Sequence, residues 1–158
     1  MNKQLIKNWN SVIKYNDDVY ILGDIFYRES VVDANEILSK LKGRKYLIKG
    51  NHDTFIEKKG IDTSVFEWIK NYHVLKYDKR KFVLFHFPIY SWQSSRKGSI
   101  HLYGYVHNNE HEVVNEVLGN NSYNVGADLN NFTPISIYEV IDKIEKQNCE
   151  IISNGFEG

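Results

Sequence analysis

The sequence predicts a layered α/β protein, and the order of its apolar segments is the main reason. Apolar residues recur at helical spacing in residues 2–13 and 31–43. Each of these segments is followed by a short, continuous apolar run, at 19–22 and 45–48, that ends in polar residues. From residue 73 onward most segments alternate like strands. We therefore expect helices alternating with parallel strands in the first half, and mostly strands and hairpins in the second.

The remaining elements are expected in the following order. Residues 64–72 are predicted to form a helix, because Ser64 and Glu67 are spaced as a capping box. A hairpin is predicted next, and then three strands, at residues 73–88, 99–107, 111–117 and 122–127. A final helix is predicted from Ser136, which has Glu139 three residues later.

Length and composition restrict the class of protein. A chain of 158 residues with 42% hydrophobic and 14% aromatic residues is expected to fold as a single domain over residues 1–158. Its 20 basic and 20 acidic residues cancel, so the bulk charge gives no reason to expect nucleic acid or anionic lipid as a partner. The single cysteine, Cys149, excludes an internal disulfide and a cysteine-rich zinc site. No stretch is apolar enough to serve as a signal peptide or a membrane span, so we expect a cytoplasmic protein that does not contact a membrane.

Polar side chains follow four predicted strands at the points where the strands end. Asp24, Asn51, His86 and His107 stand at these four ends. Ligands of open α/β sheets bind beyond the carboxyl ends of the strands. Oxygen and imidazole donors together suit Mn, Fe, Zn or Ni. Each residue alone has an ordinary structural interpretation, as a turn, a helix cap or a core histidine, but four such coincidences favour a metal site.

The same positions carry a resemblance to a known family. "GD" at 23–24, "GNHD" at 50–53, "HFP" at 86–88 and "GYVH" at 104–107 resemble the motifs of the calcineurin-like metallophosphoesterases, and in particular the small phage- and bacterial-type branch. The resemblance covers nearly the whole chain. It implies the layered α/β/β/α sandwich of that family and a divalent-metal-dependent phosphoesterase. In such an enzyme a metal-bound hydroxide attacks a phosphate mono- or diester.

The resemblance also implies roles for individual residues. Asp24 resembles the carboxylate that bridges two metals, Asn51 and His86 resemble ligands of one metal, and His107 resembles a ligand of the other. His52 resembles the imidazole that contacts the phosphate and helps to protonate the leaving group. We group Asp53 with it, as support for the turn. The substrate is expected to be a small phosphorylated molecule, and Arg28 and Arg96 are candidates to contact its phosphate.

The chain departs from the family pattern in two places. No Asp-x-His motif occurs, although family members supply two metal ligands from such a motif on a first strand. Tyr105 stands where the family's closing motif has a histidine, and a neutral phenol is a poor replacement for imidazole. We therefore expect one metal ion rather than two. The first strand of the sheet is expected to be missing, which would leave an exposed sheet edge that a homodimer or strand exchange could cover.

Two alternatives to an active enzyme follow from these departures. The protein could be a catalytically degenerate homologue that binds a ligand or partner without turnover. Met1 could also be an internal start, in which case an active two-metal enzyme would carry the missing strand upstream. Among the other histidines, His101 is interpreted as a surface residue of its strand, and His73 and His111 as residues without a chemical role.

Overall fold

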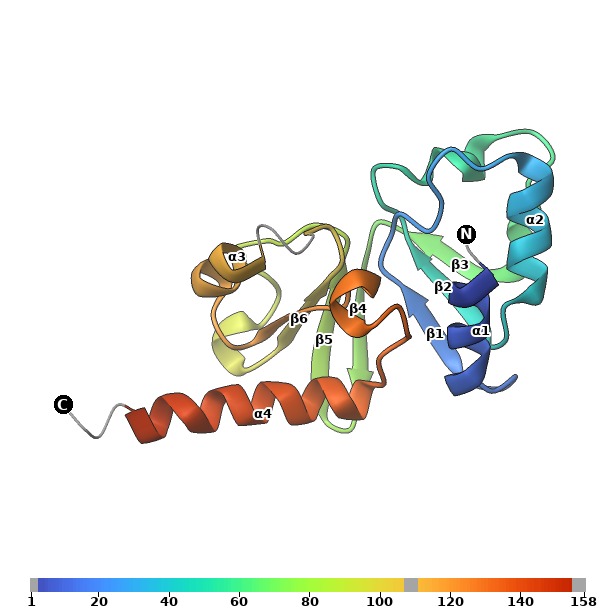
Figure 1. Cartoon of the computed structure of the whole chain (residues 1–158). Coiled ribbons are helices and arrows are strands. Elements are labelled where there is room, and N and C mark those ends of the chain that lie inside the picture. Colours follow the sequence, from blue (N-terminus) through green and yellow to red (C-terminus); the bar gives the residue numbers. More distant parts are fainter. Residues whose placement is uncertain (1–2, 107–110, 155–158) are drawn as a thin grey trace.

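The architecture consists of two sheets flanked by helices (Figure 1). The computed structural model describes residues 3–106 and 111–154. The first sheet has the strand order β1-β2-β3 and is parallel, with β1 at Asp18–Ile21, β2 at Arg44–Ile48 and β3 at Phe66–Lys70. The second sheet is mixed, with the order β4-β5-β6-β7 at Tyr72–Tyr77, Arg80–Phe85, Ile100–Tyr103 and Ser122–Asn124. The predicted α/β class with flanking helices is confirmed in this form.

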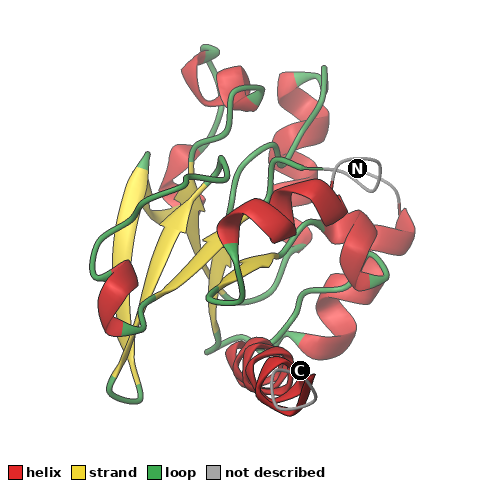
Figure 2. Cartoon of the chain, turned by 90° about the vertical axis from the view of Figure 1, so that its left-hand side faces the viewer, coloured by secondary structure: helices red, strands yellow, loops and turns green. Residues whose placement is uncertain are grey.

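The four helices in the described ranges lie around these sheets. They are α1 at Lys3–Val12, α2 at Val31–Lys40, α3 at His111–Leu118 and α4 at Ile137–Asn154. Short 3-10 turns occur at Asp53–Glu57, Thr63–Val65, Ser95–Lys97 and Ala127–Asn130. Figure 1 shows α1 and α2 beside the first sheet and α4 along the second, and Figure 2 shows α4 nearly end-on beneath the strands.

Two apolar cores hold the elements together. One core joins the sheets to each other and to α4, with Leu22 and Ile48 of the first sheet meeting Leu84 of the second and Val140 of the helix. The other core packs α2 against the far face of the first sheet around Leu38 and contains Phe26 and Phe55. Apolar burial on both faces explains why β1 and β2 are continuous apolar runs. It also fixes where their carboxyl ends lie.

The structure contradicts the prediction of a helix at residues 64–72. Only Thr63–Val65 form a 3-10 turn, and β3 begins at Phe66 and pairs with β2. The Ser64 hydroxyl donates to Asp62 at 2.5 Å instead of capping a helix with Glu67. The pairing of the backbone with β2 outweighs the local capping signal.

The prediction of a strand at residues 111–117 is also wrong. This segment forms the helix α3. The Tyr103 hydroxyl donates a hydrogen bond to the side chain of Asn115 in this helix at 3.0 Å. Val113, Val114 and Val117 fit helical spacing as well as strand composition, and so short a segment is ambiguous in the sequence. The predicted helices at α1, α2 and α4 and the hairpin β4–β5 are confirmed.

Two further findings concern the limits of the fold. Within the described ranges, β1 pairs only with β2, so it forms an edge of its sheet. No helix in this part of the chain is long and apolar enough to cross a membrane.

Candidate metal centre and active site

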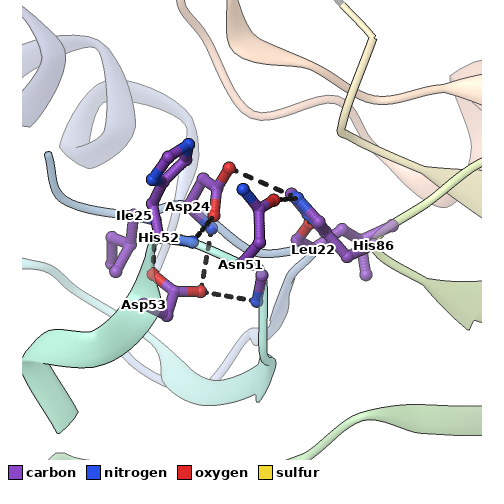
Figure 3. A network of polar contacts seen from close by, with 8 residues as sticks. Leu22, Asp24, Ile25, Asn51, His52, Asp53 and His86 are labelled. Atoms are coloured by element: carbon purple, nitrogen blue, oxygen red, sulfur yellow. Dashed lines mark hydrogen bonds and ion pairs between the residues drawn. The ribbon is translucent and has the colours of Figure 1, made fainter.

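Three strand ends from two different sheets meet at the candidate site. Asp24 follows β1, Asn51 follows β2 and His86 follows β5 (Figure 3). The core between the sheets brings these ends together, because Leu22 and Leu84, close to Asp24 and His86 in the chain, pack in the same cluster. His107, the fourth predicted ligand, lies outside the described residues.

His86 is held in a single orientation. Its side chain is fully buried, and its Nδ1 lies 2.7 Å from the main-chain oxygen of Leu22. A carbonyl oxygen can only accept a hydrogen bond, so Nδ1 carries the hydrogen. The main-chain oxygen of His86 accepts from the amides of Gly104 and Tyr105, both at 3.1 Å. With both ends fixed, Nε2 points toward Asn51 Oδ1 at 3.1 Å and Asp24 Oδ2 at 3.3 Å.

The glycines of the first two motifs are required by close packing. A Cβ on Gly23 would lie 2.3 Å from His86 Nδ1, and Gly23 has a φ of +92°. A Cβ on Gly50 would lie 2.3 Å from Asp24 Oδ1. Asp24 itself has a φ of +54°, in the left-handed region that non-glycine residues seldom adopt. The two turns therefore approach each other as closely as backbone allows.

Asp53 connects these two turns. Its Oδ2 accepts from the amides of Asp24 and Gly50, both at 2.8 Å, and its Oδ1 accepts from the amide of Ile25 at 2.9 Å. Burial raises the pKa of this fully enclosed carboxyl, although the three amide hydrogen bonds act in the opposite direction. Because its oxygens are occupied by backbone donors, Asp53 positions the site. It holds Asp24 and Asn51 in register.

The acceptor atoms at the centre fit a cation. Asp24 Oδ1 accepts from the amide of His52 at 2.8 Å, which leaves Oδ2 facing His86. Nε2 of His86, Oδ1 of Asn51 and Oδ2 of Asp24 therefore converge on one point, where a positive charge is stabilised by both oxygens. Carboxylate, amide oxygen and imidazole are donors that Mn, Fe, Zn and Ni accept.

This donor set is small. Within residues 3–106 and 111–154, no cluster of three or more His, Cys, Asp or Glu side chains has the geometry of a metal site. Asp24 and His86 supply two such groups, and Asn51 adds the third donor. The arrangement therefore fits one ion held by three protein atoms, with its remaining positions open to water or substrate.

His52 belongs to the same turn but faces a different space. Figure 3 shows its ring pointing away from the Asp53 carboxylate. The exposed ring of His52 meets the ring of Tyr27 edge-on, with centroids 5.5 Å apart. Both residues line a hollow of about 280 Å³ that also contains Arg28. Arg96 lies on the exposed turn Ser95–Lys97 and does not line this hollow.

The structure contradicts the interpretation of one histidine, and the sequence does not predict some residues that line the hollow beside His52. His101 is fully buried, not a surface residue of its strand. Tyr27 and Lys58 line the hollow beside His52, but neither belongs to a recognisable motif. The hollow forms only when the loop after Asp24 folds against the segment after Asn51, and no periodicity in the sequence indicates that contact.

Comparison with known proteins identifies the family of the chain. A model of the calcineurin-like phosphoesterases matches residues 3–125, which include Asp24, Asn51, His52 and His86. The chain belongs to this family. The chain is 36% identical over 150 residues to an uncharacterized protein of Methanocaldococcus jannaschii, covering 92% of this chain and 76% of that one. It also resembles the crystal structure of a protein of unknown function from Aquifex aeolicus. The TM-score is 0.70 and the identity 26%, over 89% of this chain and 83% of the other.

Proposed function

We propose that this member of the calcineurin-like phosphoesterase family hydrolyses a small phosphate mono- or diester and depends on one divalent transition-metal ion. The observation that carries the proposal is the convergence of His86 Nε2, Asn51 Oδ1 and Asp24 Oδ2, with Nε2 3.1 Å from the amide oxygen and 3.3 Å from the carboxylate oxygen. When bound, a divalent ion polarises phosphoryl oxygens and makes water a better nucleophile.

The chain's own residues have separate roles in this proposal. Asp24, Asn51 and His86 hold the ion, and Asp53 fixes the two turns that carry the first two of these ligands. Water forms a new bond to phosphorus while the bond from phosphorus to the ester oxygen breaks. The water loses one proton to solvent, and His52 donates one to the departing oxygen. Arg28 lies on the His52 side, where a cation stabilises the charge on the phosphoryl group.

A specific observation supports a second candidate, a degenerate homologue that binds without turnover. Tyr105 replaces a histidine of the family motif, and its ring packs edge-on at 5.5 Å from His86. A phenol ring in that place adds no imidazole to the donor set. A binding protein of this kind would keep the ion and lose hydrolysis.

Metal content and hydrolysis together test the proposal. We expect hydrolysis of an aryl phosphate in added Mn²⁺, with about one ion bound per chain. Asp24→Ala and His52→Ala are each expected to reduce kcat by at least about 100-fold, a size typical of losing a positioned acid–base group. Only Asp24→Ala is expected to weaken binding of Mn²⁺ as well, because His52 is not among the proposed ligands.

Lys76→Gln is the control, since Lys76 is exposed and lies toward the hairpin turn of β4 and β5, away from the carboxyl end of β5. Activity that survives both site substitutions would exclude this centre. A bound ion with no hydrolysis of mono- or diesters would favour the degenerate homologue.

The free edge of β1 supports a proposal about assembly. Val19 and Leu22 are buried, so the strand is covered on its faces, while β2 is its only partner within the part of the chain described. Unpaired strand edges of this kind readily pair with another chain. A second copy of the chain is the occupant we propose. Light scattering across protein concentrations checks it, and a strictly monomeric species at every concentration would contradict it.

A further inference from the structure

The hollow beside His52 has a definite relation to the candidate centre. Its walls come from the loop at residues 26–29 and from the segment between Asn51 and Lys58. It adjoins the centre through Asn51 and His52, whereas Asp24 and His86 do not line it. A phosphate held at the centre would therefore direct its leaving group, on the His52 side, into this hollow.

Three aromatic side chains, Phe26, Tyr27 and Phe55, are among the residues that line the hollow. Phe26 and Phe55 are each only 3% exposed and meet edge-on with centroids 4.9 Å apart, so they form a fixed apolar floor. Tyr27 in contrast leaves 64% of its surface exposed and stands nearly perpendicular to the His52 ring, at 82°. An exposed aromatic ring above an apolar floor suits a planar ring in the ligand.

Two cations flank the same hollow. The guanidinium carbon of Arg28 lies 5.1 Å from the centroid of the Tyr27 ring, and Lys58 Nζ donates to the main-chain oxygen of Glu29 at 3.2 Å. Among the residues that the structure describes, neither cation forms an ion pair with a carboxylate. Other cations on the molecule do, as in the pair of Arg80 with Glu145 at 2.7 Å. Two cations without a carboxylate partner favour an anionic ligand.

The backbone holds Arg28 in this place at some cost. Its φ of +58° lies in the left-handed region, which non-glycine residues seldom adopt. In the left-handed conformation at residue 28, Tyr27, Arg28 and Glu29 all line the hollow. Strain of this type concentrates at ligand-binding positions.

We propose that this hollow is the leaving-group subsite and that the leaving group is a nucleotide. The base stacks on Tyr27 over the Phe26–Phe55 floor, and Arg28 and Lys58 bind the nucleotide's own phosphate. The proposal rests on the proposed function, because His52 defines the leaving-group side. It specifies a substrate that carries an aromatic base and a second phosphate besides the one that reacts.

Calorimetric titration with AMP in the presence of EDTA tests the subsite without the metal. We expect AMP to bind at least about tenfold more tightly than ribose 5-phosphate, which lacks the base, and than adenosine, which lacks the phosphate. Tyr27→Ala should abolish the advantage of AMP over ribose 5-phosphate, and Tyr27→Phe should retain it. Arg28→Gln combined with Lys58→Gln should abolish the advantage of AMP over adenosine.

Tyr15→Ala is the matched control for Tyr27→Ala. Tyr15 is also an exposed tyrosine with a cation over its ring, Lys42 at 5.5 Å, but it precedes β1 and so lies at the end of that strand opposite to Asp24. It should leave all three affinities unchanged.

Equal affinities of the wild type for AMP and ribose 5-phosphate, or a Tyr27→Ala variant that binds AMP as the wild type does, would overturn the subsite. Failure of the two proposals is distinguishable. Tyr27-dependent binding of AMP without any hydrolysis would overturn the proposed function and leave the hollow as a nucleotide-binding site without a leaving group. Mn²⁺-dependent hydrolysis of an aryl phosphate without Tyr27-dependent binding of AMP would overturn the subsite alone.

Discussion

His86 and His101 are two buried histidines with the same anchor and opposite consequences. Both side chains are fully buried, one directly after β5 and the other on the neighbouring strand β6. Each places Nδ1 against a main-chain oxygen, of Leu22 at 2.7 Å and of Val83 at 3.1 Å respectively. The two residues differ in what surrounds Nε2.

The Nε2 of His101 lies among backbone groups. Ile89 donates its amide to this nitrogen at 3.3 Å, and the Phe87 oxygen lies 3.2 Å away. Trp92 and Tyr103 cover the ring, with centroids 5.3 and 5.4 Å from it. The ring therefore ties a loop to the sheet. The Nε2 of His86 instead faces two side-chain oxygens and remains available to a cation. What the second nitrogen faces, rather than burial, separates a candidate ligand from a structural residue.

The largest effect should come from crowding His86. Gly23→Ala places a Cβ 2.3 Å from His86 Nδ1 and 2.8 Å from the Gly50 backbone, and does so at a φ of +92°. We expect a loss of about 3 kcal/mol in the free energy of unfolding, from overpacking and left-handed strain together. Urea unfolding measures it. Gly98→Ala is the matched control, because its φ is +79° but nothing lies within 4 Å, and it should cost about 1 kcal/mol. Equal losses for the two variants would contradict the close packing.

The next effect separates the two histidines by metal affinity. His86→Gln should weaken binding of Mn²⁺ by at least about tenfold, since a proposed ligand is lost. His101→Gln should leave the affinity within about twofold, because His101 bonds only to backbone groups. Isothermal titration with Mn²⁺ measures both. If His101→Gln weakened binding as much as His86→Gln, the distinction between the two nitrogens would fail.

The stability of the fold should depend on His101. His101→Ala opens a cavity under Trp92 and leaves the Ile89 amide without its acceptor, so we expect a loss of about 2–3 kcal/mol on unfolding. Trp92→Phe is a useful companion, since it keeps a ring over His101 while removing the indole hydrogen bond to the Ser99 oxygen. It should cost about 1 kcal/mol. A His101→Ala protein as stable as the wild type would show that this histidine does not hold the loop.

The smallest effect concerns pH. Burial lowers the pKa of His101, and the Val83 and Phe87 oxygens beside its two ring nitrogens only partly oppose this by favouring the charged form. Below about pH 6.5 the imidazole of His101 therefore binds a proton in the unfolded chain but not in the folded chain. The free energy of unfolding falls as the pH is lowered below this value. His101→Gln should lose less stability than the wild type between about pH 7 and 5.5. Burial also lowers the pKa of His73, and this effect is present in both the wild type and the His101→Gln variant. Urea midpoints at the two pH values measure the difference, and parallel pH profiles would refute it.

The sequence by itself determined the features that depend on local chemistry. The apolar runs of β1 and β2 and the Gly-Asp and Gly-Asn-His-Asp turns could be identified directly, because a turn's backbone needs are met by its own residues. The capping box of α4 was of the same kind, as the Ser136 amide donates to Glu139 at 2.9 Å and the Glu139 amide donates to the Ser136 hydroxyl at 3.2 Å. The convergence of Asp24, Asn51 and His86 was predictable as well, because all three follow strand ends.

Only the tertiary structure decided the features that depend on a distant partner. Phe66–Lys70 became a strand because β2 was available for pairing, against a local signal for a helix. His101 became a core residue because the loop after β5 folds over it, and its sequence neighbours give no sign of this. The hollow beside His52 required the loop after β1 to meet the segment after β2. The physical reason is common to all three: hydrogen bonds and apolar burial are satisfied between segments, and the free energy of those contacts exceeds the small local preferences that a sequence pattern reveals.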